Sequence, residues 1–364
     1  MPSPAKVTIV DVARAAGVAV GTVSRVFNNA ADVNTAIRMR VLEKARELNY
    51  TRLRQRRARP SGPEMNSAGT PGPAIGAVFF GMEDTLVQLP VVSAGLQGIE
   101  NTLSSHGRSL MIANIPNGDR VPPFLRDGSV AGVLLKGPNQ GLLPSPEENE
   151  LVRAILAVPH VWLMGRPANA TGDHCNFDTS TAGRLAVEHL HARGHRRVAF
   201  FNPKPGQIQF ERVKASFVAN AARLDLAWSI HEAELSGALT WPLPAITNQD
   251  KVDTLVDRWA AMPRATRPTA FFVPSDRTAV QLYSSLARRG LAVGSDVSVI
   301  SCNNERSLLS NLHPGLTSID IHADFIGRRA VDQLLWRIAH PLEPNTVQLL
   351  AEPTLVVRES VAAL

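Results

Sequence analysis

From residue 74 onward, short apolar runs alternate with segments that have helical periodicity. The runs are AIGAVFF, SLMIANI, VAGVLLKG, VPHVWLM, RRVAFF, TAFFVPS and DVSVISC. Strands that are apolar along their whole length are typical of parallel sheets with helices on both faces. Residues 74–364 are too many for one such sheet. We therefore expect an α/β core of two parallel-sheet lobes.

Residues 8–50 carry three shorter helical patterns. Thr8 and Asp11 have the spacing of a capping box, Gly17 predicts the end of the first helix, and Asn34 can begin the third. A glycine turn between the first two helices predicts an all-α helix-turn-helix domain over residues 1–50. The positions expected to face its core are Ile9, Val12, Ala13, Ala16, Val23, Val26, Phe27, Ile37, Val41, Ala45 and Leu48.

Positive charge is concentrated at one end of the chain. Residues 1–73 hold twelve basic and five acidic side chains, whereas the rest of the chain holds 26 basic and 27 acidic ones. This asymmetry indicates a small module that binds a polyanion, joined to a neutral body. Residues 51–73 combine an arginine run with a Pro- and Gly-rich stretch and are expected to form a basic hinge and linker.

Several classes of site are not indicated. The two cysteines have no metal or redox spacing, so neither a disulfide framework nor a cofactor is expected. His189, His191 and His195 cross a helix end and a glycine turn, so they do not share one face and predict no metal site. The N-terminus lacks the apolar core of a signal peptide, and no run is long enough to span a membrane. We expect a cytoplasmic protein.

The second helical pattern, over about residues 20–28, fits a helix that enters the major groove of DNA. Val23, Val26 and Phe27 would face the core of the domain. Arg25 can donate two hydrogen bonds to one guanine, and the small polar side chains suit phosphate contacts. The residues expected to face outward are Val20, Gly21, Thr22, Ser24, Arg25 and Asn28.

These residues resemble the N-terminal domain of the lactose-repressor/galactose-repressor (LacI/GalR) family of bacterial transcription regulators. The matching motifs are T-I-x-D-V-A, A-G-V, T-V-S-R-V-x-N and E-L-N-Y, and core segments such as GRLAVEHLHARGHRRVAFF resemble the family's periplasmic-binding-protein-like core. The resemblance implies a homodimer that binds a palindromic operator in double-stranded DNA and is associated with the nucleoid when it is bound. It also implies a small effector, expected to be a sugar, held between the two lobes.

The resemblance assigns roles within the DNA-binding domain. Val20 and Gly21 occupy the positions that choose the operator sequence, and Arg25 occupies that of the arginine that reads a base. At position 19 the family usually has a serine that caps the recognition helix, which Ala19 cannot do. The residues that the resemblance places at the DNA backbone are Thr8, Thr22, Ser24, Asn28, Arg38 and Tyr50.

The hinge departs from the family pattern. Arg52 and Leu53 stand where proline and asparagine are usual, Arg59 stands near the position of a leucine that wedges into the minor groove, and Pro60 would end any helix. Our hypothesis is that the arginines, Arg56 and Arg59 included, bind phosphates or enter a narrow minor groove. A disordered basic tether is the alternative.

The effector residues are expected between the lobes, where strands end. Asn303 and Ser275 replace the aspartate and asparagine that many members carry, so a known effector cannot be transferred to this chain. The alternatives are a packed loop anchor for Trp241 and a surface ion pair for Arg166. The predicted effector-binding residues are Asp84, Gln88, Arg166, Arg212, Trp241, Ser275, Asp276 and Asn303.

The sequence thus predicts a ligand-responsive transcriptional regulator, with repression the expected mode, and no enzyme. One alternative is an α/β enzyme that processes a sugar or nucleotide, but the chain has no G-x-x-x-x-G-K-[ST], G-x-G-x-x-G or G-x-S-x-G motif at the expected places. The other alternative is an architectural DNA-binding protein whose core binds no ligand.

Overall fold

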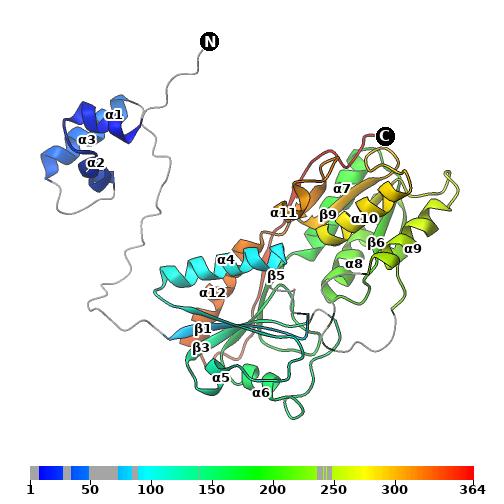
Figure 1. Cartoon of the computed structure of the whole chain (residues 1–364), viewed down its shortest axis with the longest axis horizontal. Helices are drawn as coiled ribbons and strands as arrows, with labels where there is room; N and C mark the ends of the chain where they lie inside the picture. Colours follow the sequence, from blue (N-terminus) through cyan, green and yellow to red (C-terminus); the bar gives the residue numbers. More distant parts are fainter. Residues whose placement is uncertain are drawn as a thin grey trace. The chain divides into compact units, whose positions relative to one another are not determined.

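The computed structural model divides the chain into two compact units, Met1–Ala68 and Gly69–Leu364 (Figure 1). The residues that the structure describes are 8–27, 34–48, 73–83, 89–138, 140–235, 241, 243 and 248–364.

The first unit contains the helices α1 (Ile9–Ala16), α2 (Val20–Phe27) and α3 (Thr35–Glu47). The Asp11 carboxylate accepts hydrogen bonds from the Thr8 N–H at 2.9 Å and the Thr8 hydroxyl at 2.6 Å, which fixes the start of α1. Gly17 ends α1 with a φ of 63°, a left-handed conformation that suits glycine. The apolar positions predicted to face the core are buried or partly buried, apart from Phe27, whose side chain lies outside the description.

The second unit contains two six-stranded sheets, with orders β11-β5-β4-β3-β1-β2 and β12-β10-β9-β8-β6-β7. All neighbouring strands are parallel except the β10–β12 pair. The predicted fold class, two parallel-sheet lobes after a helix-turn-helix domain, is confirmed. The strands are β1 (Ala74–Phe80), β2 (Leu110–Ile115), β3 (Val130–Lys136), β4 (His160–Leu163), β5 (Asp173–Phe177), β6 (Arg197–Asn202), β7 (Ala227–Glu232), β8 (Ala270–Phe272), β9 (Ser298–Asn303), β10 (Thr317–Asp320), β11 (Gln348–Ala351) and β12 (Thr354–Val356).

Helices cover both sheets, and the chain crosses between the lobes three times. We call the lobe built on the sheet with β1 the N-terminal lobe and the lobe built on the sheet with β6 the C-terminal lobe. The chain passes between them from β5 to α7, from β10 to α12 and from β11 to β12, and α12 packs on the N-terminal lobe. The two lobes are therefore joined by three segments of the chain. The helices are α4 (Pro90–Ser105), α5 (Pro123–Arg126), α6 (Glu150–Leu156), α7 (Thr179–Ala192), α8 (Ile208–Arg223), α9 (Gln249–Ala260), α10 (Asp276–Arg288), α11 (Arg306–Leu309) and α12 (Ala323–Ala339).

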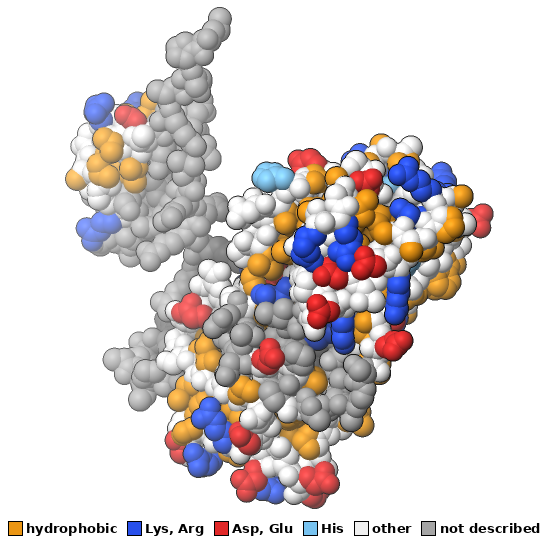
Figure 2. Space-filling model, turned by 45° about the vertical axis from the view of Figure 1, so that its right-hand side comes forward, with side chains coloured by type: hydrophobic (Ala, Val, Ile, Leu, Met, Phe, Trp, Pro, Cys, Tyr) orange, Lys and Arg blue, Asp and Glu red, His pale blue; other side chains and the backbone are white. Residues whose placement is uncertain are grey.

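On the face of the second unit that Figure 2 shows, acidic and basic side chains are interspersed, in keeping with its near-neutral charge. Cys175 and Cys302 are buried free thiols. Within the described residues, no cluster of three or more His, Cys, Asp or Glu side chains could hold a metal ion. No helix in this part of the chain is long and apolar enough to cross a membrane.

The N-terminal lobe depends on a close crossing of α4 and α12. A Cβ on Gly98 would lie 2.0 Å from the Asp324 carbonyl oxygen, and a Cβ on Gly327 would lie 2.1 Å from the Gly95 carbonyl oxygen. Both obstacles are backbone atoms, so a larger residue would force the helices apart.

Gly98→Ala is therefore expected to lower the free energy of unfolding by about 1–3 kcal/mol, although alanine favours an isolated helix. Urea denaturation of the full chain measures this change. Asn101→Ala, at an exposed position of the same helix, is the control and should change the free energy by less than about 0.5 kcal/mol. An equally stable Gly98→Ala variant would contradict the observed helix distance.

Candidate functional sites

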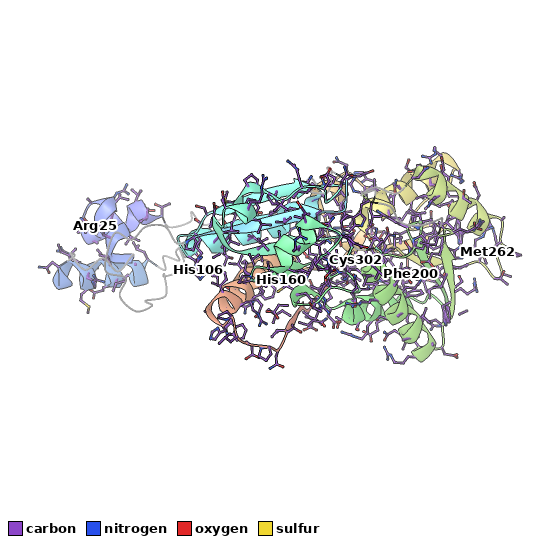
Figure 3. All side chains as sticks on the ribbon, turned by 90° about the horizontal axis from the view of Figure 1, so that it is seen from below. Arg25, His106, His160, Phe200, Met262 and Cys302 are labelled. Atoms are coloured by element: carbon purple, nitrogen blue, oxygen red, sulfur yellow. The ribbon has the colours of Figure 1, made fainter. Side chains whose placement is uncertain are left out.

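The helix α2 presents the predicted DNA-reading residues on one side. Val23 and Val26 are buried against α1 and α3, while Val20, Gly21 and Arg25 are exposed. Arg25 is labelled on this unit in Figure 3. A helix held by a thin apolar spine, with small side chains and one arginine outside, has the form required to enter the major groove.

The other predicted DNA contacts are only partly described. Thr8 is exposed at the start of α1, Thr22 is half-buried on α2, and Arg38 is half-buried on α3. The residues that lie outside the description are Asn28, Tyr50, Arg56, Arg59 and the side chain of Ser24.

Helix α2 begins without a side-chain cap at Ala19. The Ala19 carbonyl accepts hydrogen bonds from the Thr22 N–H at 2.9 Å and the Val23 N–H at 3.3 Å, but its methyl group cannot accept from the first N–H groups of the helix. The departure from the family's serine therefore falls at the start of the helix that is expected to read DNA.

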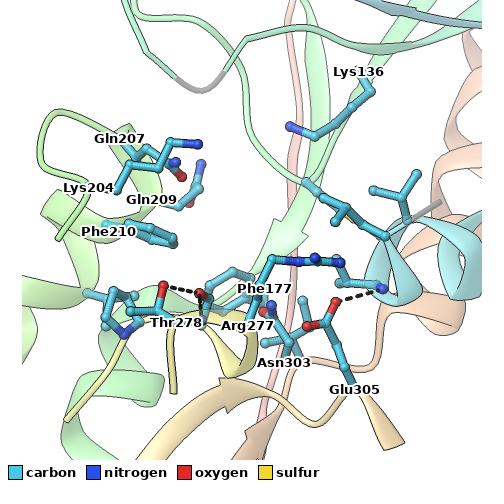
Figure 4. A pocket seen from close by; sticks show the side chains of 18 of the residues that line it. Lys136, Phe177, Lys204, Gln207, Gln209, Phe210, Arg277, Thr278, Asn303 and Glu305 are labelled. Carbon is cyan, nitrogen blue, oxygen red and sulfur yellow. Dashed lines mark hydrogen bonds between the residues drawn. The ribbon is translucent and has the colours of Figure 1, made fainter. Parts of the chain in front are cut away.

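A cavity lies between the two lobes of the second unit (Figure 4). Its walls are residues at or just beyond the carboxyl ends of parallel strands: Lys136 closes β3, Phe177 closes β5, Asn303 closes β9, Lys204 follows β6 and Ser275 follows β8. Parallel strands bring these ends to one edge of each sheet, which is where α/β proteins bind ligands.

Apolar and amide side chains line much of this cavity. Aromatic and aliphatic groups offer surface for the C–H faces of a ligand, and amides offer both donors and acceptors. The Gln209 side-chain oxygen accepts a hydrogen bond from the Asn176 amide at 2.7 Å, which holds Gln209 in place. The main members of this lining are Met82, Val91, Met164, Phe177, Phe210, Gln207 and Gln209.

Besides the Asn176–Gln209 bond, which joins β5 to α8, other hydrogen bonds cross between the lobes beside the cavity. The Val91 N–H in the first turn of α4 donates to the Glu305 carboxylate of the other lobe at 3.0 Å, and the Gln140 amide donates to the Pro205 carbonyl at 2.7 Å. The side chain of Leu89, which precedes α4, cannot cap the helix, so the Glu305 carboxylate of the other lobe caps it instead. Burial raises the pKa of Glu305.

Of the predicted effector-binding residues, Ser275 and Asn303 line the cavity. Asp276, which follows Ser275 in the sequence, does not line the cavity. It is fully buried, and its carboxylate accepts hydrogen bonds from Ser301, from Ser318 at 2.7 Å and from the Glu305 N–H at 2.6 Å. Burial raises the pKa of Asp276 to about 7. The turn into α10 directs Asp276 inward and leaves Arg277 in the cavity wall.

The remaining predicted residues lie elsewhere. Arg166 is half-buried and donates to the Gly172 carbonyl at 2.7 Å. Arg212 lines a separate, open groove between α7 and α8. Trp241 packs edge-on against Phe80, with 5.8 Å between ring centroids, which matches the alternative of a packed loop anchor. Asp84 and Gln88 lie outside the described residues.

Three cationic side chains in the cavity wall were not predicted: Lys136, Lys204 and Arg277. Lys136 is 4% exposed, and burial lowers its pKa to about 7. Burial also lowers the pKa of Lys204 to about 8, with Lys251 adding to the effect and Glu83 opposing it. The available signal in the sequence was a single lysine at the end of an apolar run, VAGVLLKG, which is too weak to identify a site.

Two family models match the chain. Residues 8–52 match "Bacterial regulatory proteins, lacI family", and residues 187–361 match "Periplasmic binding protein-like domain". The two matches together cover more than half of the chain.

Curated relatives match along nearly the full length. The ribose operon repressor of Escherichia coli (strain K12) is 27% identical over 363 residues, which cover 97% of this chain and 99% of the relative. The protein named "HTH-type transcriptional repressor PurR" of Aliivibrio fischeri (strain MJ11) is 28% identical over 361 residues, which cover 97% of this chain and 98% of the relative. These relatives are transcriptional repressors.

Solved structures share the fold. The lac repressor dimer bound to operator and the anti-inducer ONPF has a TM-score of 0.60 and 24% identity over 98% of this chain and 100% of that chain. A LacI family regulator from Enterococcus faecium with bound ribose has a TM-score of 0.62 and 19% identity over 80% and 99%. With its lacI-type helix-turn-helix domain, its two-lobed core and repressors as full-length relatives, the chain belongs to the LacI family of bacterial regulatory proteins.

Proposed function

We propose that the protein is a homodimeric repressor that binds a palindromic operator through α2 and responds to a small effector held between its lobes. The observation that carries the proposal is the exposed set Val20, Gly21 and Arg25 on a helix whose other side is buried. Full-length relatives named as repressors support the regulatory role. The lac repressor structure, a dimer on its operator, supports the assembly.

In this proposal each part of the chain has one task. Residues 1–50 read the operator, residues 51–73 form a basic hinge whose arginines contact phosphates or a narrow minor groove, and residues 74–364 bind the effector and dimerise. Val20 and Gly21 offer only methyl contact and close approach, so the operator positions they face should favour thymine methyl groups.

The effector is proposed to bind in the cavity at the strand ends. Its walls come from both lobes, and three chain crossings connect the lobes, so a ligand that contacts both walls favours the closed arrangement. The effector and the DNA-competent dimer each favour one of two lobe arrangements. This difference couples effector binding to operator binding. The E. faecium structure, which has ribose bound, supports a ligand of about the size of ribose.

Selection of bound duplexes from a random pool tests DNA recognition, and Arg25→Ala tests its mechanism. The wild-type chain should recover an inverted repeat. Arg25→Ala should lose about 1–3 kcal/mol of specific binding and relax one base position in each half-site, while non-specific binding keeps most of its salt dependence.

Arg40→Ala is the matched control, because Arg40 is exposed on α3 and outside the reading surface. It should weaken all duplexes alike or have no effect. A uniform loss across sequences in Arg25→Ala would show that Arg25 contacts only phosphate. Recovery of no preferred sequence by the wild-type chain would overturn the proposed function.

A further inference from the structure

The start of α4 depends on the other lobe for one of its hydrogen bonds. Pro90, the first residue of α4, has no N–H, and the two N–H groups that follow Val91 both donate to the Leu89 carbonyl at 2.9 Å. The Val91 N–H donates instead to the Glu305 carboxylate of the C-terminal lobe at 3.0 Å, a bond that Figure 4 shows as a dashed line. A backbone N–H without an acceptor is costly, so this bond favours the arrangement in which Glu305 reaches α4.

A strained turn directs Glu305 toward the other lobe. Asn303 and Asn304, which precede it, have φ values of 115° and 52°, and such positive values are uncommon for residues other than glycine. Hydrogen bonds hold the turn: the Asn304 N–H donates to the Ser318 hydroxyl at 3.1 Å, and the Asn304 amide donates to the Asp320 carboxylate at 2.9 Å. Backbone strain of this kind persists where the surrounding structure fixes it, and it is concentrated at functional and switch regions.

The backbone of Glu305 is anchored in its own lobe. Its N–H donates to the fully buried Asp276 carboxylate at 2.6 Å. The same carboxylate accepts hydrogen bonds from Ser301 of β9 and, at 2.7 Å, from Ser318 of β10. Only the side chain of Glu305 therefore extends to α4. A separation of the lobes at this point would break the bond to Val91 and leave the anchor intact.

The carboxylate that crosses between the lobes is buried and has an opposite charge near it. Glu305 is 6% exposed, and Figure 4 shows Arg277 beside it in the cavity wall. Burial raises the pKa of Glu305, while the Val91 N–H and Arg277 act in the opposite direction. Asp276 is a like charge on the side of its own lobe. The bond to Val91 therefore satisfies a carboxylate that has little contact with water.

The Glu305 bond differs in kind from other hydrogen bonds between the lobes. Those from Gln140 to Pro205 and from Asn176 to Gln209 are both 2.7 Å long and join neutral groups. A hydrogen bond to a carboxylate is about twice as strong as one between neutral groups. We therefore expect the Glu305 bond to favour closure more than either of these two.

Resting on the regulatory function proposed above, we propose that the Glu305 side chain is a latch between the lobes. Its carboxylate caps α4 only while the lobes are closed, and its release from the Val91 N–H is a step in the switch between the two lobe arrangements. Glu305 also lines the cavity, so a ligand bound there lies beside the latch. Loss of the latch shifts the population toward the open arrangement and thereby changes operator affinity.

Thiol labelling inside the cavity of the full-length chain measures how often the lobes open. Thr278 lines the cavity from α10 of the C-terminal lobe and is 4% exposed (Figure 4), so a Thr278→Cys side chain should react when the lobes separate and not when the start of α4 frays. Cys175 and Cys302 are buried, and a chain without the Thr278→Cys change gives their background rate. When closing is faster than labelling, the labelling rate is proportional to the open fraction, however small that fraction is.

Variants of Glu305 test the latch in the Thr278→Cys chain. Glu305→Ala should raise the labelling rate about tenfold, because it removes a hydrogen bond to a carboxylate. Glu305→Gln keeps the shape and one acceptor oxygen, so it should raise the rate less. Both variants remove a buried carboxylate that faces the like charge of Asp276, so they are expected to fold. Glu150→Ala, which removes an exposed carboxylate from the first turn of α6, is the control and should leave the rate unchanged.

Three results would overturn the latch. The first is a Glu305→Ala variant that labels no faster than its parent. The second is faster hydrogen exchange at the start of α4 with unchanged labelling, which would show that Glu305 only caps the helix. The third is a labelling rate that rises steeply at low urea concentrations, because unfolding exposes much new surface whereas lobe opening exposes little.

Operator binding separates the latch from the proposed function. On a duplex recovered by the selection described above, Glu305→Ala should change the affinity about fivefold or more. Faster labelling with unchanged operator affinity would keep the latch and overturn the coupling between the lobes and DNA. Failure of the wild-type chain to select any sequence would overturn the proposed function alone, because the labelling rate is measured without DNA.

Discussion

Asp173→Ala is expected to lower the free energy of unfolding by about 3–5 kcal/mol. The Asp173 side chain is fully buried at the start of β5 and pairs with Arg337 of α12 at 2.7 Å. Its carboxylate also accepts hydrogen bonds from the Gln333 amide and the Val347 N–H, both at 2.8 Å. Without Asp173, a largely buried guanidinium would have lost its counter-charge, and α12 and β11 would have lost their common attachment to β5.

Urea denaturation of the full chain measures this loss. Asp332→Ala is the control, because Asp332 forms an exposed pair with Arg329 at 2.8 Å, and such pairs contribute little. Its unfolding free energy should change by less than about 0.5 kcal/mol. An Asp173→Ala variant as stable as this control would show that the buried pair does not hold the lobe together.

The effect of Asp173 should depend on pH in one direction. Burial alone would raise the pKa of Asp173, but the hydrogen bonds from Arg337, Gln333 and the Val347 N–H outweigh it and lower the pKa below its ordinary value of 3.8. A lowered native-state pKa stabilises the fold above the unfolded-state value, and the contribution is lost as the pH falls through the native value. The difference between wild type and Asp173→Ala should therefore shrink below about pH 4.

The same residue shows why some strands could not be predicted from sequence. All five residues of β5, DHCNF, are buried, yet only Cys175 and Phe177 are apolar. Asp173 gains its partners from positions 333, 337 and 347, and no local pattern reports contacts over such separations. The apolar runs at β1, β3 and β6, in contrast, were predicted because burial on both faces leaves a continuous local signal.

Of the four edge strands, β2 was predicted from its apolar run, whereas β7, β11 and β12 were not. β7 is an edge strand whose residues are all exposed or only partly buried, and Trp228 on it is 44% exposed. β11 and β12 consist of four and three residues where the chain makes its last crossing. Such segments are strands because a neighbouring strand is already in place, so tertiary pairing decides their conformation.

The first unit was predicted well because its determinants are local. The Thr8–Asp11 cap, the glycine at position 17 and the spacing of Val12, Ala16 and Val23 are all visible within a few residues of each other. Two of the residues predicted at strand ends, Ser275 and Asn303, line the cavity, and effector binding there stays a prediction. The strand ends do not indicate which of two consecutive residues, Asp276 or Arg277, faces the cavity.

Asp276→Ala is expected to destabilise the protein about as strongly as the Asp173 variant. The Asp276 carboxylate ties the start of α10 to β9 and β10 through Ser301 and Ser318, and to the segment before α11 through the Glu305 N–H. Its removal leaves three buried donors without an acceptor, and each unsatisfied buried donor costs about 1–3 kcal/mol, partly offset by relaxation. We expect a total loss of about 3–5 kcal/mol.

The position of Asp276 beneath the cavity gives this variant a second readout. Glu305 stands in the cavity wall and its N–H donates to the Asp276 carboxylate, so the affinity of a ligand bound in the cavity should fall together with stability. Asp276→Asn keeps the shape and one acceptor oxygen, so it should recover part of both losses. If Asp276→Ala instead lost ligand binding while its unfolding curve stayed that of the wild type, Asp276 would be a direct effector ligand, and the cavity would have to open toward it in the ligand-bound state.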